Sequence, residues 1–188
     1  DQIKVQVKEG NTVVAEGSNE AGEVLKITIP NAKKWTLQQP HLYDLSISIV
    51  RKGKTVDEVR SYAALRKIAM KPDEKGIQRM YLNDEFVFQY GPLDQGWWPD
   101  GLYTAPTDEA LLFDIQKTKE MGFNMIRKHV KVEPARWYYH CDKLGMLVWQ
   151  DMPSGDLGNH WEQRPGITGK ETDRIRTPES EEIYRNEW

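Results

Sequence analysis

The feature that most constrains this chain is a change in its hydrophobic periodicity. Near the N-terminus apolar and polar residues alternate, as in Ile3, Val5 and Val7, which is typical of a strand with one buried face. Further along, short apolar runs such as Phe123–Val130 alternate with amphipathic stretches such as the one that begins at Pro134. The two patterns together predict an antiparallel β unit followed by an α/β unit.

The N-terminal pattern predicts a β-sandwich. Expected strands flank a hairpin at Glu9–Asn11, and three more follow at Val24–Ile29, Leu42–Val50 and Thr55–Leu65. That makes about five short strands, whereas an immunoglobulin-type sandwich has about seven. We therefore expect residues 1–70 to form an immunoglobulin-like β-sandwich that lacks its first strands.

The second pattern predicts a parallel sheet, because strands and helices alternate along the chain. The expected elements are a hairpin (Gln78–Leu82 and Phe86–Tyr90), a helix between Thr107 and Gly122, a strand (Phe123–Val130), a helix from Pro134 to Gly145, a strand (Met146–Trp149) and a third helix from Pro178. Three strands are too few to bury the edges and faces of such a sheet. We therefore expect residues 71–188 to be α/β, the first three βα units of a TIM barrel, (β/α)8, whose remainder lies beyond Trp188.

Composition and motifs narrow the function classes. Lys plus Arg (26) nearly balances Asp plus Glu (29), which argues against a nucleic-acid partner that needs a broad basic face. No apolar run reaches the ~20 residues that span a bilayer, so no membrane association is expected. The single cysteine, Cys141, excludes an internal disulfide. Because no metal-ligand spacing and no Gly-rich phosphate loop is present, we expect neither a metal nor a cofactor.

The candidate chemistry lies where the expected strands end. Parallel α/β folds bind ligands beyond the C-terminal ends of their strands, which here are Gly91–Tyr103, Arg127–Glu133 and Gln150–Gly155. An indole can pack against the C–H face of a sugar ring, while charged groups bind its hydroxyls. The substrate-binding candidates are Asp94, Trp97, Trp98, Arg127, His129 and Asp151. The alternative for the two tryptophans is that one closes the barrel mouth and the other packs on the sandwich.

Three of these candidates should form one polar cluster. Arg127 and His129 are two residues apart on one strand and share a face, and Asp151 ends the next strand. A charged arginine inside a barrel is costly unless it is paired, and Asp151 is the nearest expected carboxylate. The alternative is an internal ion pair that never meets a ligand.

Two other acidic positions have simpler interpretations. Glu133 comes at the start of an expected helix, where capping is the simpler role. Asn186-Glu187 matches a glycosidase acid/base motif, but it lies in a charged helical run with no strand before it. We therefore interpret it as a solvated helix face.

Longer motifs occur in a specific order along the chain: Trp35-x4-Pro40-x-Leu42-Tyr43-x-Leu45, Arg60–Ile68, Met80–Phe88, Met121–His129 and Asp142–Asp151. They resemble the junction of glycoside hydrolase family 2, the family of β-galactosidases, β-glucuronidases and β-mannosidases. The first motif is similar to the family's central immunoglobulin-like domain, and the last two are similar to its second and third barrel strands. Only Lys128 separates Arg127 from His129, where the galactosidase pattern has two residues.

The resemblance implies a retaining β-glycosidase whose two carboxylates lie about 5 Å apart. In this family they follow the fourth and seventh barrel strands, so none is expected in this chain, and the chain alone should be inactive. The resemblance also suggests a carbohydrate substrate and a periplasmic or secreted location. Because open sheet edges carry unpaired N–H and C=O groups, we also expect self-association through the incomplete faces. Two alternatives stay open: a non-catalytic carbohydrate-binding or scaffolding module, and a small hydrolase that uses Glu133 and Asp151.

Overall fold

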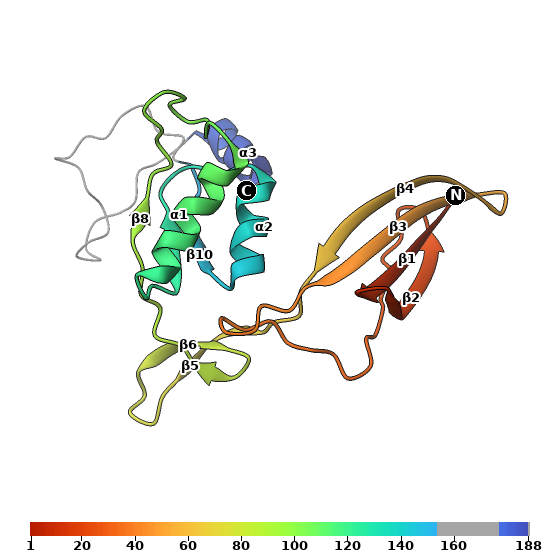
Figure 1. The fold of residues 1–188 in the computed structure, drawn as a ribbon, viewed down its shortest axis with the longest axis horizontal. Helices are drawn as coiled ribbons and strands as arrows, with labels where there is room; N and C mark the ends of the chain where they lie inside the picture. The colour runs from red at the N-terminus through yellow and green to blue at the C-terminus, as the bar shows by residue number, and fades with distance from the viewer. Residues whose placement is uncertain (154–176, 188) are drawn as a thin grey trace.

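The computed structural model describes residues 1–153 and 177–187. Figure 1 shows two bodies of different kinds, an antiparallel sheet from the N-terminal residues and an α/β unit from the C-terminal ones. A small β unit lies where the two bodies meet. The predicted order, β first and α/β second, is confirmed.

One antiparallel sheet contains the strands β1 (Gln2–Glu9), β2 (Thr12–Glu20), β3 (Tyr43–Arg51) and β4 (Lys54–Ala63), in the order β2-β1-β3-β4. Its hairpins lie where the sequence predicts them. Gly10 (φ 59°) lies between β1 and β2, and Lys52 and Gly53 (φ 49° and 75°) join β3 to β4. Positive φ at both turn residues matches the twist of the strands that the turn connects.

The strand predicted at Val24–Ile29 is wrong. These residues belong to no strand, and Val24 is exposed. The segment instead packs against the sheet: a Cβ added to Gly17 of β2 would meet side-chain atoms of Ile27 at 3.1 Å and of Leu25 at 3.2 Å. Packing on a sheet face produces the same apolar–polar alternation as pairing within the sheet. The strands β1 to β4 form one antiparallel sheet, and the sandwich itself stays a prediction.

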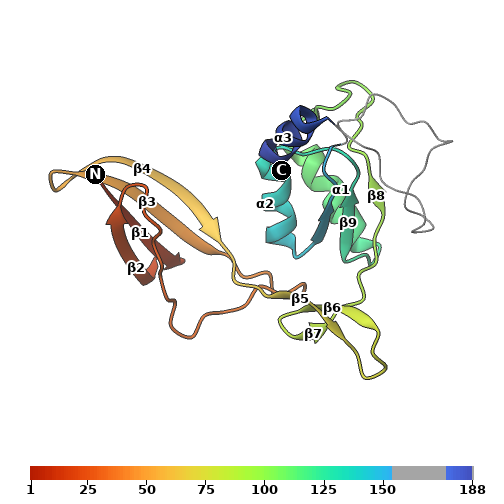
Figure 2. The ribbon, with the colours of Figure 1, turned by 180° about the vertical axis from the view of Figure 1, so that it is seen from behind.

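Three short strands form the β unit at the junction: β5 (Ile68–Pro72), β6 (Gln78–Leu82) and β7 (Glu85–Phe86) (Figure 2). The predicted turn at Asn83-Asp84 is confirmed, and both residues have positive φ. However, β7 ends at Phe86 and does not reach Tyr90. The carbonyl of Tyr90 instead accepts from the N–H of Asn124 at 3.0 Å, because the chain has already turned toward the parallel sheet.

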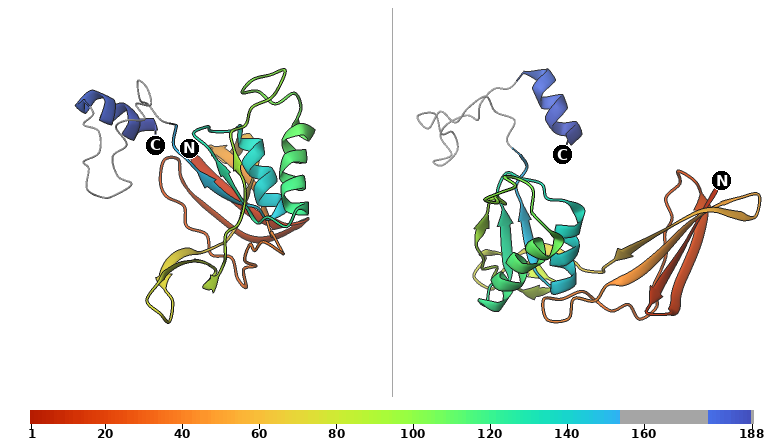
Figure 3. Two further views of the ribbon diagram at one scale, coloured as in Figure 1. Left: turned by 90° about the vertical axis from the view of Figure 1, so that its left-hand side faces the viewer. Right: turned by 45° about the horizontal axis from the view of Figure 1, so that its top comes forward.

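The α/β unit alternates strands and helices in the order β8 (Leu93–Asp94), α1 (Asp108–Glu120), β9 (Met125–Lys128), α2 (Ala135–Leu144) and β10 (Leu147–Gln150). The strands are parallel, as predicted, in the order β10-β9-β8. Figure 3 shows both helices on one face of this sheet. β8 begins after Gly91-Pro92, so the first strand ends at Asp94 and not at Tyr90.

Helix boundaries follow local sequence signals. Thr107 caps α1, because its hydroxyl accepts from the backbone N–H of Ala110, and Gly122 (φ 89°) follows the last turn. α2 begins after Pro134 and ends at Gly145, which adopts the left-handed conformation (φ 73°). These ends agree with the predicted ones.

A third helix, α3 (Pro178–Glu187), has no buried residue. Asn186 and Glu187 are exposed on it, which agrees with their interpretation as a solvated helix face. Within the parts of the chain that the structure describes, no helix is long and apolar enough to cross a membrane.

Two clusters of buried side chains organise the α/β unit. One lies between the helices and the sheet and contains Leu111, Ile115, Ile126, Trp137, Cys141 and Met146. In the other, Met125 and Leu147 from the N-terminal ends of β9 and β10 pack against Trp35 and Leu82. The junction therefore closes the N-terminal ends of the parallel strands, and polar side chains gather at their other ends.

Candidate functional site

The two charged residues of strand β9 lie on opposite faces of the parallel sheet. Ile126 packs in the cluster under the helices, and Lys128, two residues on, is also buried, with a side chain only 1% exposed. The side chain of Arg127 lies between them in sequence, faces the other way and is 47% exposed. The face opposite the helices therefore carries an accessible guanidinium at the C-terminal end of β9.

The predicted pairing of Arg127 with Asp151 is present. Arg127 Nε lies 3.1 and 3.2 Å from the two carboxylate oxygens, and Nη2 lies 2.9 Å from Oδ2. The hydrogen bonds from Arg127 hold the pKa of Asp151 below its usual range, and the charge of His129 adds a smaller contribution in the same direction. The same pair raises the pKa of Arg127. Both groups are therefore ionised across the neutral range.

His129 and Trp149 lie beside this pair. His129 follows the last residue of β9, where its backbone N–H donates to the carbonyl of Asp94 at 2.9 Å. Trp149 pairs in register with Arg127 and shares its face, and its indole N–H donates to Gln89. Sequence reasoning missed Trp149, although its spacing of two from Asp151 on one strand was the available signal.

Asp94 does not join this group. In the sheet register Asp94 pairs with Lys128, on the helix side, and its carboxylate accepts from Lys128 Nζ at 2.5 Å and from the N–H of Gly96 at 2.7 Å. Lys128 also donates to Glu133 at 2.9 Å and lies 4.5 Å from the centre of the Trp137 ring. These contacts satisfy a lysine that would otherwise be buried at a large cost.

The capping role expected for Glu133 is wrong. The residue before α2 is Pro134, and no side chain caps this helix. Glu133 is buried because Lys128 and Lys131 both pair with its Oε1, at 2.9 and 3.0 Å. Since Lys128 and Arg127 point to opposite faces, Glu133 and Asp151 sit in separate ion pairs. This arrangement does not suit the two-carboxylate hydrolase considered above.

The two adjacent tryptophans have different surroundings. Trp97 is 54% exposed and packs against Tyr103, with ring centres 4.2 Å apart. Trp98 is partly buried against the cluster under the helices, and its backbone pairs with Leu102 in both directions. Trp97 is thus the accessible aromatic surface, and Trp98 anchors the loop.

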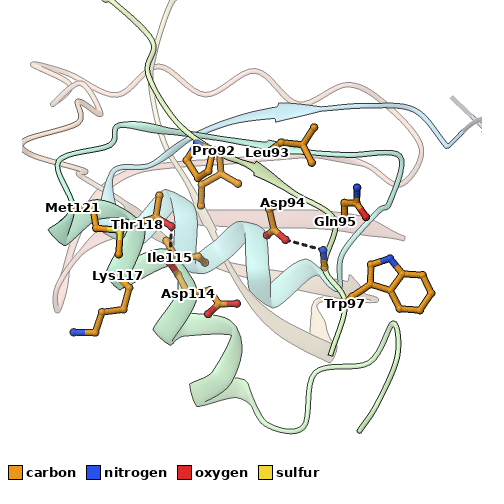
Figure 4. Close-up of a pocket in the computed structure, with 12 residues that line it drawn as sticks. Pro92, Leu93, Asp94, Gln95, Trp97, Asp114, Ile115, Lys117, Thr118 and Met121 are labelled. Atoms are coloured by element: carbon orange, nitrogen blue, oxygen red, sulfur yellow. Dashed lines mark hydrogen bonds between the residues drawn. The ribbon is translucent and has the colours of Figure 1, made fainter. Parts of the chain in front are cut away.

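A cavity of about 470 Å³ lies between this loop and α1 and is shown in Figure 4. Asp94 points into it, and the Trp97 indole extends away from the helix. Burial raises the pKa of Asp114 on α1, and the charge of Asp94 adds to the shift. Arg127 does not line this cavity, which lies on the helix side of the sheet. A second hollow of about 480 Å³ follows β9 and includes Tyr103, Lys131 and Glu133.

The structure describes the residue ranges 1–153 and 177–187. Within them, no group of three or more His, Cys, Asp or Glu side chains is arranged to hold a metal ion. The predicted ligand-binding stretch Gln150–Gly155 is described only in part, because residues 154 and 155 lie outside the described residues.

Comparison with known proteins gives one family. Glycosyl hydrolases family 2 matches residues 1–66. A putative beta-glucuronidase of Formosa agariphila is 30% identical over 169 residues, which are 84% of this chain and 20% of that protein. A beta-glucuronidase of Bacteroides fragilis is 28% identical over 81% of this chain and 21% of its own length. A beta-galactosidase of Lactococcus lactis is 28% identical over 67% of this chain and 12% of its own length.

Comparison with solved structures also finds beta-glucuronidases. An FMN-binding beta-glucuronidase from Facaelibacterium prausnitzii L2-6 superposes with a TM-score of 0.69 at 25% identity, over 81% of this chain and 23% of that one. A Parabacteroides merdae beta-glucuronidase has the same fold, with a TM-score of 0.70 at 22% identity, over 84% of this chain and 20% of its own. The chain spans about a fifth of the length of the Formosa agariphila and Bacteroides fragilis proteins named above. The chain is a member of glycosyl hydrolases family 2.

Proposed function

We propose that this chain supplies part of the sugar-binding end of a retaining glycosidase that hydrolyses β-glycosides, with β-glucuronides and β-galactosides as the first candidates. The single observation that carries this is the Arg127–Asp151 pair, with contacts of 2.9 to 3.2 Å, at the C-terminal ends of parallel strands whose other ends are closed. That edge is where α/β barrels bind substrates. The beta-glucuronidases and beta-galactosidases among the relatives supply the substrate class.

The finer architecture belongs to the same proposal. Residues 1–70 would be the immunoglobulin-like β-sandwich, of which β1 to β4 form one sheet, and residues 71–188 the first βα units of a (β/α)8 barrel. The parallel order β10-β9-β8, with both helices on one face, supports this assignment. The exposed face that carries Arg127 would then line the barrel interior.

Each candidate residue receives a role from its surroundings. Arg127, Asp151 and His129 would bind and orient sugar hydroxyls, and Trp97 would pack against the apolar face of the ring. Asp94 and Trp98 face the helix side and would act by holding the loop. No catalytic acid or nucleophile is assigned in this chain, because Glu133 and Asp151 are bound in separate ion pairs.

The test compares hydrolysis of aryl β-glucuronide and β-galactoside by this chain and by a longer polypeptide that carries it together with the rest of a barrel. The account expects no turnover by the 188-residue chain and turnover by the longer one. In the longer polypeptide Arg127→Met should reduce kcat/KM, whereas the exposed-helix control Lys143→Met should not. Turnover by the chain alone that Glu133→Gln or Asp151→Asn abolishes would instead support the small hydrolase.

Self-association forms a smaller part of the proposal. The parallel sheet exposes Leu93 and Trp149, and among the described residues its outer strands β8 and β10 each pair on one side, which favours pairing between copies. Light scattering over a wide concentration range should show association of the isolated chain. A stable monomer throughout would contradict it.

A further inference from the structure

Lys131 is the feature of this molecule whose contacts the proposed function leaves unexplained. It lies between β9 and α2, and its side chain is only 10% exposed. A lysine ammonium has three N–H donors. Here Nζ lies 2.8 Å from the carbonyl of Gly96, 2.8 Å from the carbonyl of Tyr103 and 3.0 Å from Glu133 Oε1. All three donors therefore face an acceptor.

Two of these acceptors bracket the loop that carries the exposed tryptophan. Gly96 comes directly before Trp97, and Tyr103 is the ring against which Trp97 packs. Lys131 thus ties the two ends of this loop to one point, and its ammonium also lies 5.2 Å from the centre of the Tyr103 ring. Charge-assisted hydrogen bonds of this kind are stronger than neutral ones.

Glu133 fixes the ammonium in turn. Its Oε1 accepts from Lys128 as well as from Lys131, and Lys128 is buried and held by Asp94. The loop packs directly on this charged group: Gly96 has a φ of +66°, and a Cβ there would lie 2.4 Å from Glu133 Oε1 and 2.8 Å from Lys131 Nζ. A non-glycine residue here would be strained at this φ and would displace the ends of both side chains.

We propose that Lys131 is a positioning residue that holds the loop Gly96–Tyr103 so that the Trp97–Tyr103 pair is preformed as an aromatic surface at the C-terminal end of the strands. The role of that surface in sugar binding rests on the proposed function, but the positioning itself does not. A loop fixed in advance loses less conformational freedom on binding, which strengthens binding without any new contact to the ligand.

The experiment labels the full chain with 5-fluorotryptophan and follows the fluorine NMR signals of its seven tryptophans, with Trp97→Phe assigning the signal of interest. In Lys131→Met the Trp97 signal should move toward that of free 5-fluorotryptophan, while the signal of buried Trp137 stays in place. Lys131→Arg should restore the Trp97 signal. The control Lys143→Met removes a lysine that also lies over a tyrosine ring, Tyr139, and should change nothing.

An unmoved Trp97 signal in folded Lys131→Met overturns the proposal. If that variant loses the Trp137 signal of the folded protein, the same comparison is made with Lys131→Gln, which removes the ammonium but keeps a polar side chain. An unmoved Trp97 signal there overturns the proposal equally.

Titration with methyl β-D-glucuronide separates this proposal from the proposed function. If the sugar binds, Lys131→Met should weaken its affinity roughly tenfold, as when only about a tenth of the molecules hold the competent loop. Equal affinity for wild type and variant would overturn the role of the positioned Trp97–Tyr103 surface in sugar binding and leave the sugar site intact. If no sugar binds but Lys131→Met displaces the Trp97 signal, the positioning role stands and the proposed sugar site fails.

Discussion

At the scale of single residues, β9 shows how burial sets the energetic weight of a charge. Arg127 and Lys128 are neighbours and both pair with carboxylates, but one side chain is 47% exposed and the other 1%. An exposed ion pair contributes little, because water screens it and two side chains must be ordered. Removing the buried Lys128 would take one charged partner from Asp94 and one from Glu133, and Glu133 is itself buried.

The first prediction compares these two neighbours. Lys128→Met should lower the free energy of unfolding by about 3–5 kcal/mol, since it leaves Asp94 without its charged partner and the buried Glu133 with Lys131 alone. Arg127→Met should lower it much less, because Asp151 remains accessible to water. Urea unfolding of both variants measures the difference. Equal losses would show that the two faces of β9 do not differ as described.

The second prediction concerns pH. Because Arg127 lowers the pKa of Asp151 in the folded state, the unfolded state binds more protons as the pH falls through the acidic range. The stabilisation is therefore present above about pH 4, the usual aspartate pKa, and is lost as the pH falls through the lowered value. Wild type should exceed Asp151→Asn in stability at pH 7 by less than ~1 kcal/mol, with the gap closing in acid. A gap that is constant with pH, or equal to that of the exposed control Asp100→Asn, would contradict this.

Sequence reasoning recovers part of the site and fails for a definable physical reason. The Arg127–Asp151 pair could be predicted because strand period and strand order fix both the face and the neighbour. The role of Glu133 could not, since it depends on Lys128 and Lys131 converging on one carboxylate through burial. The face on which Asp94 lies could not be predicted either, because it follows from the register of β8 with β9, and β8 starts later than expected.

Among the secondary-structure elements, the two glycines that follow helices α1 and α2 differ in their surroundings. Gly122 and Gly145 both follow helices and both have positive φ, 89° and 73°. Around Gly122 nothing lies within 4 Å of an added Cβ, whereas at Gly145 the carbonyl oxygen of Leu37 would lie 2.4 Å away. Gly145 therefore ends α2 and also lets the loop from the N-terminal sheet approach.

The third prediction compares alanine substitutions at these two glycines, with Gly122 as the control for Gly145. Gly122→Ala should cost about 1–2 kcal/mol in stability, the strain of a left-handed non-glycine residue. Gly145→Ala should cost that strain plus about 1–3 kcal/mol more for displacing the Leu37 backbone. Thermal or urea unfolding measures both, and equal costs would show that the contact with Leu37 is not tight.

The elements themselves were predictable where a local signal determined them. Capping by Thr107, the stop at Gly145 and the turn at Gly53 each follow from one residue's conformational preference. Val24–Ile29 was misassigned because a segment packed on a sheet face has the same periodicity as a strand within it. The sequence does not predict β5, because this strand is recognised by its pairing with β6 and not by a pattern of its own.

At the scale of the whole molecule, Asp142 on α2 joins the two bodies. Its carboxylate accepts from Tyr62 at 3.0 Å and pairs with Arg66 at 3.4 Å, and its backbone carbonyl accepts from the indole N–H of Trp35 at 2.7 Å. Trp35 is fully buried, and Arg66 lies over its ring. The N-terminal sheet is thus fixed to the helix that supports the candidate site.

The fourth prediction tests the contact between Tyr62 and Asp142 at this junction. Burial, together with the hydrogen bond to Asp142, raises the pKa of Tyr62 to about 12. The contact therefore contributes stability that is present below the usual tyrosine pKa of about 10 and is lost as the pH rises through the raised value. Absorbance titration of wild type against Tyr62→Phe should assign one late-titrating tyrosine, and Asp142→Asn should lower its pKa. A Tyr62 that titrates normally would mean that the junction is open.

The central claim is that the C-terminal ends of the parallel strands bind a sugar through Arg127 and Trp97. NMR titration of the chain with methyl β-D-glucuronide and methyl β-D-galactoside, following the side-chain N–H signals of these two residues, tests it most directly. The account predicts saturable shifts of both signals with at least one sugar, smaller shifts for buried Trp137, and loss of binding in Arg127→Met. Saturable binding that leaves the Arg127 and Trp97 signals unmoved, or that survives Arg127→Met unchanged, would contradict it.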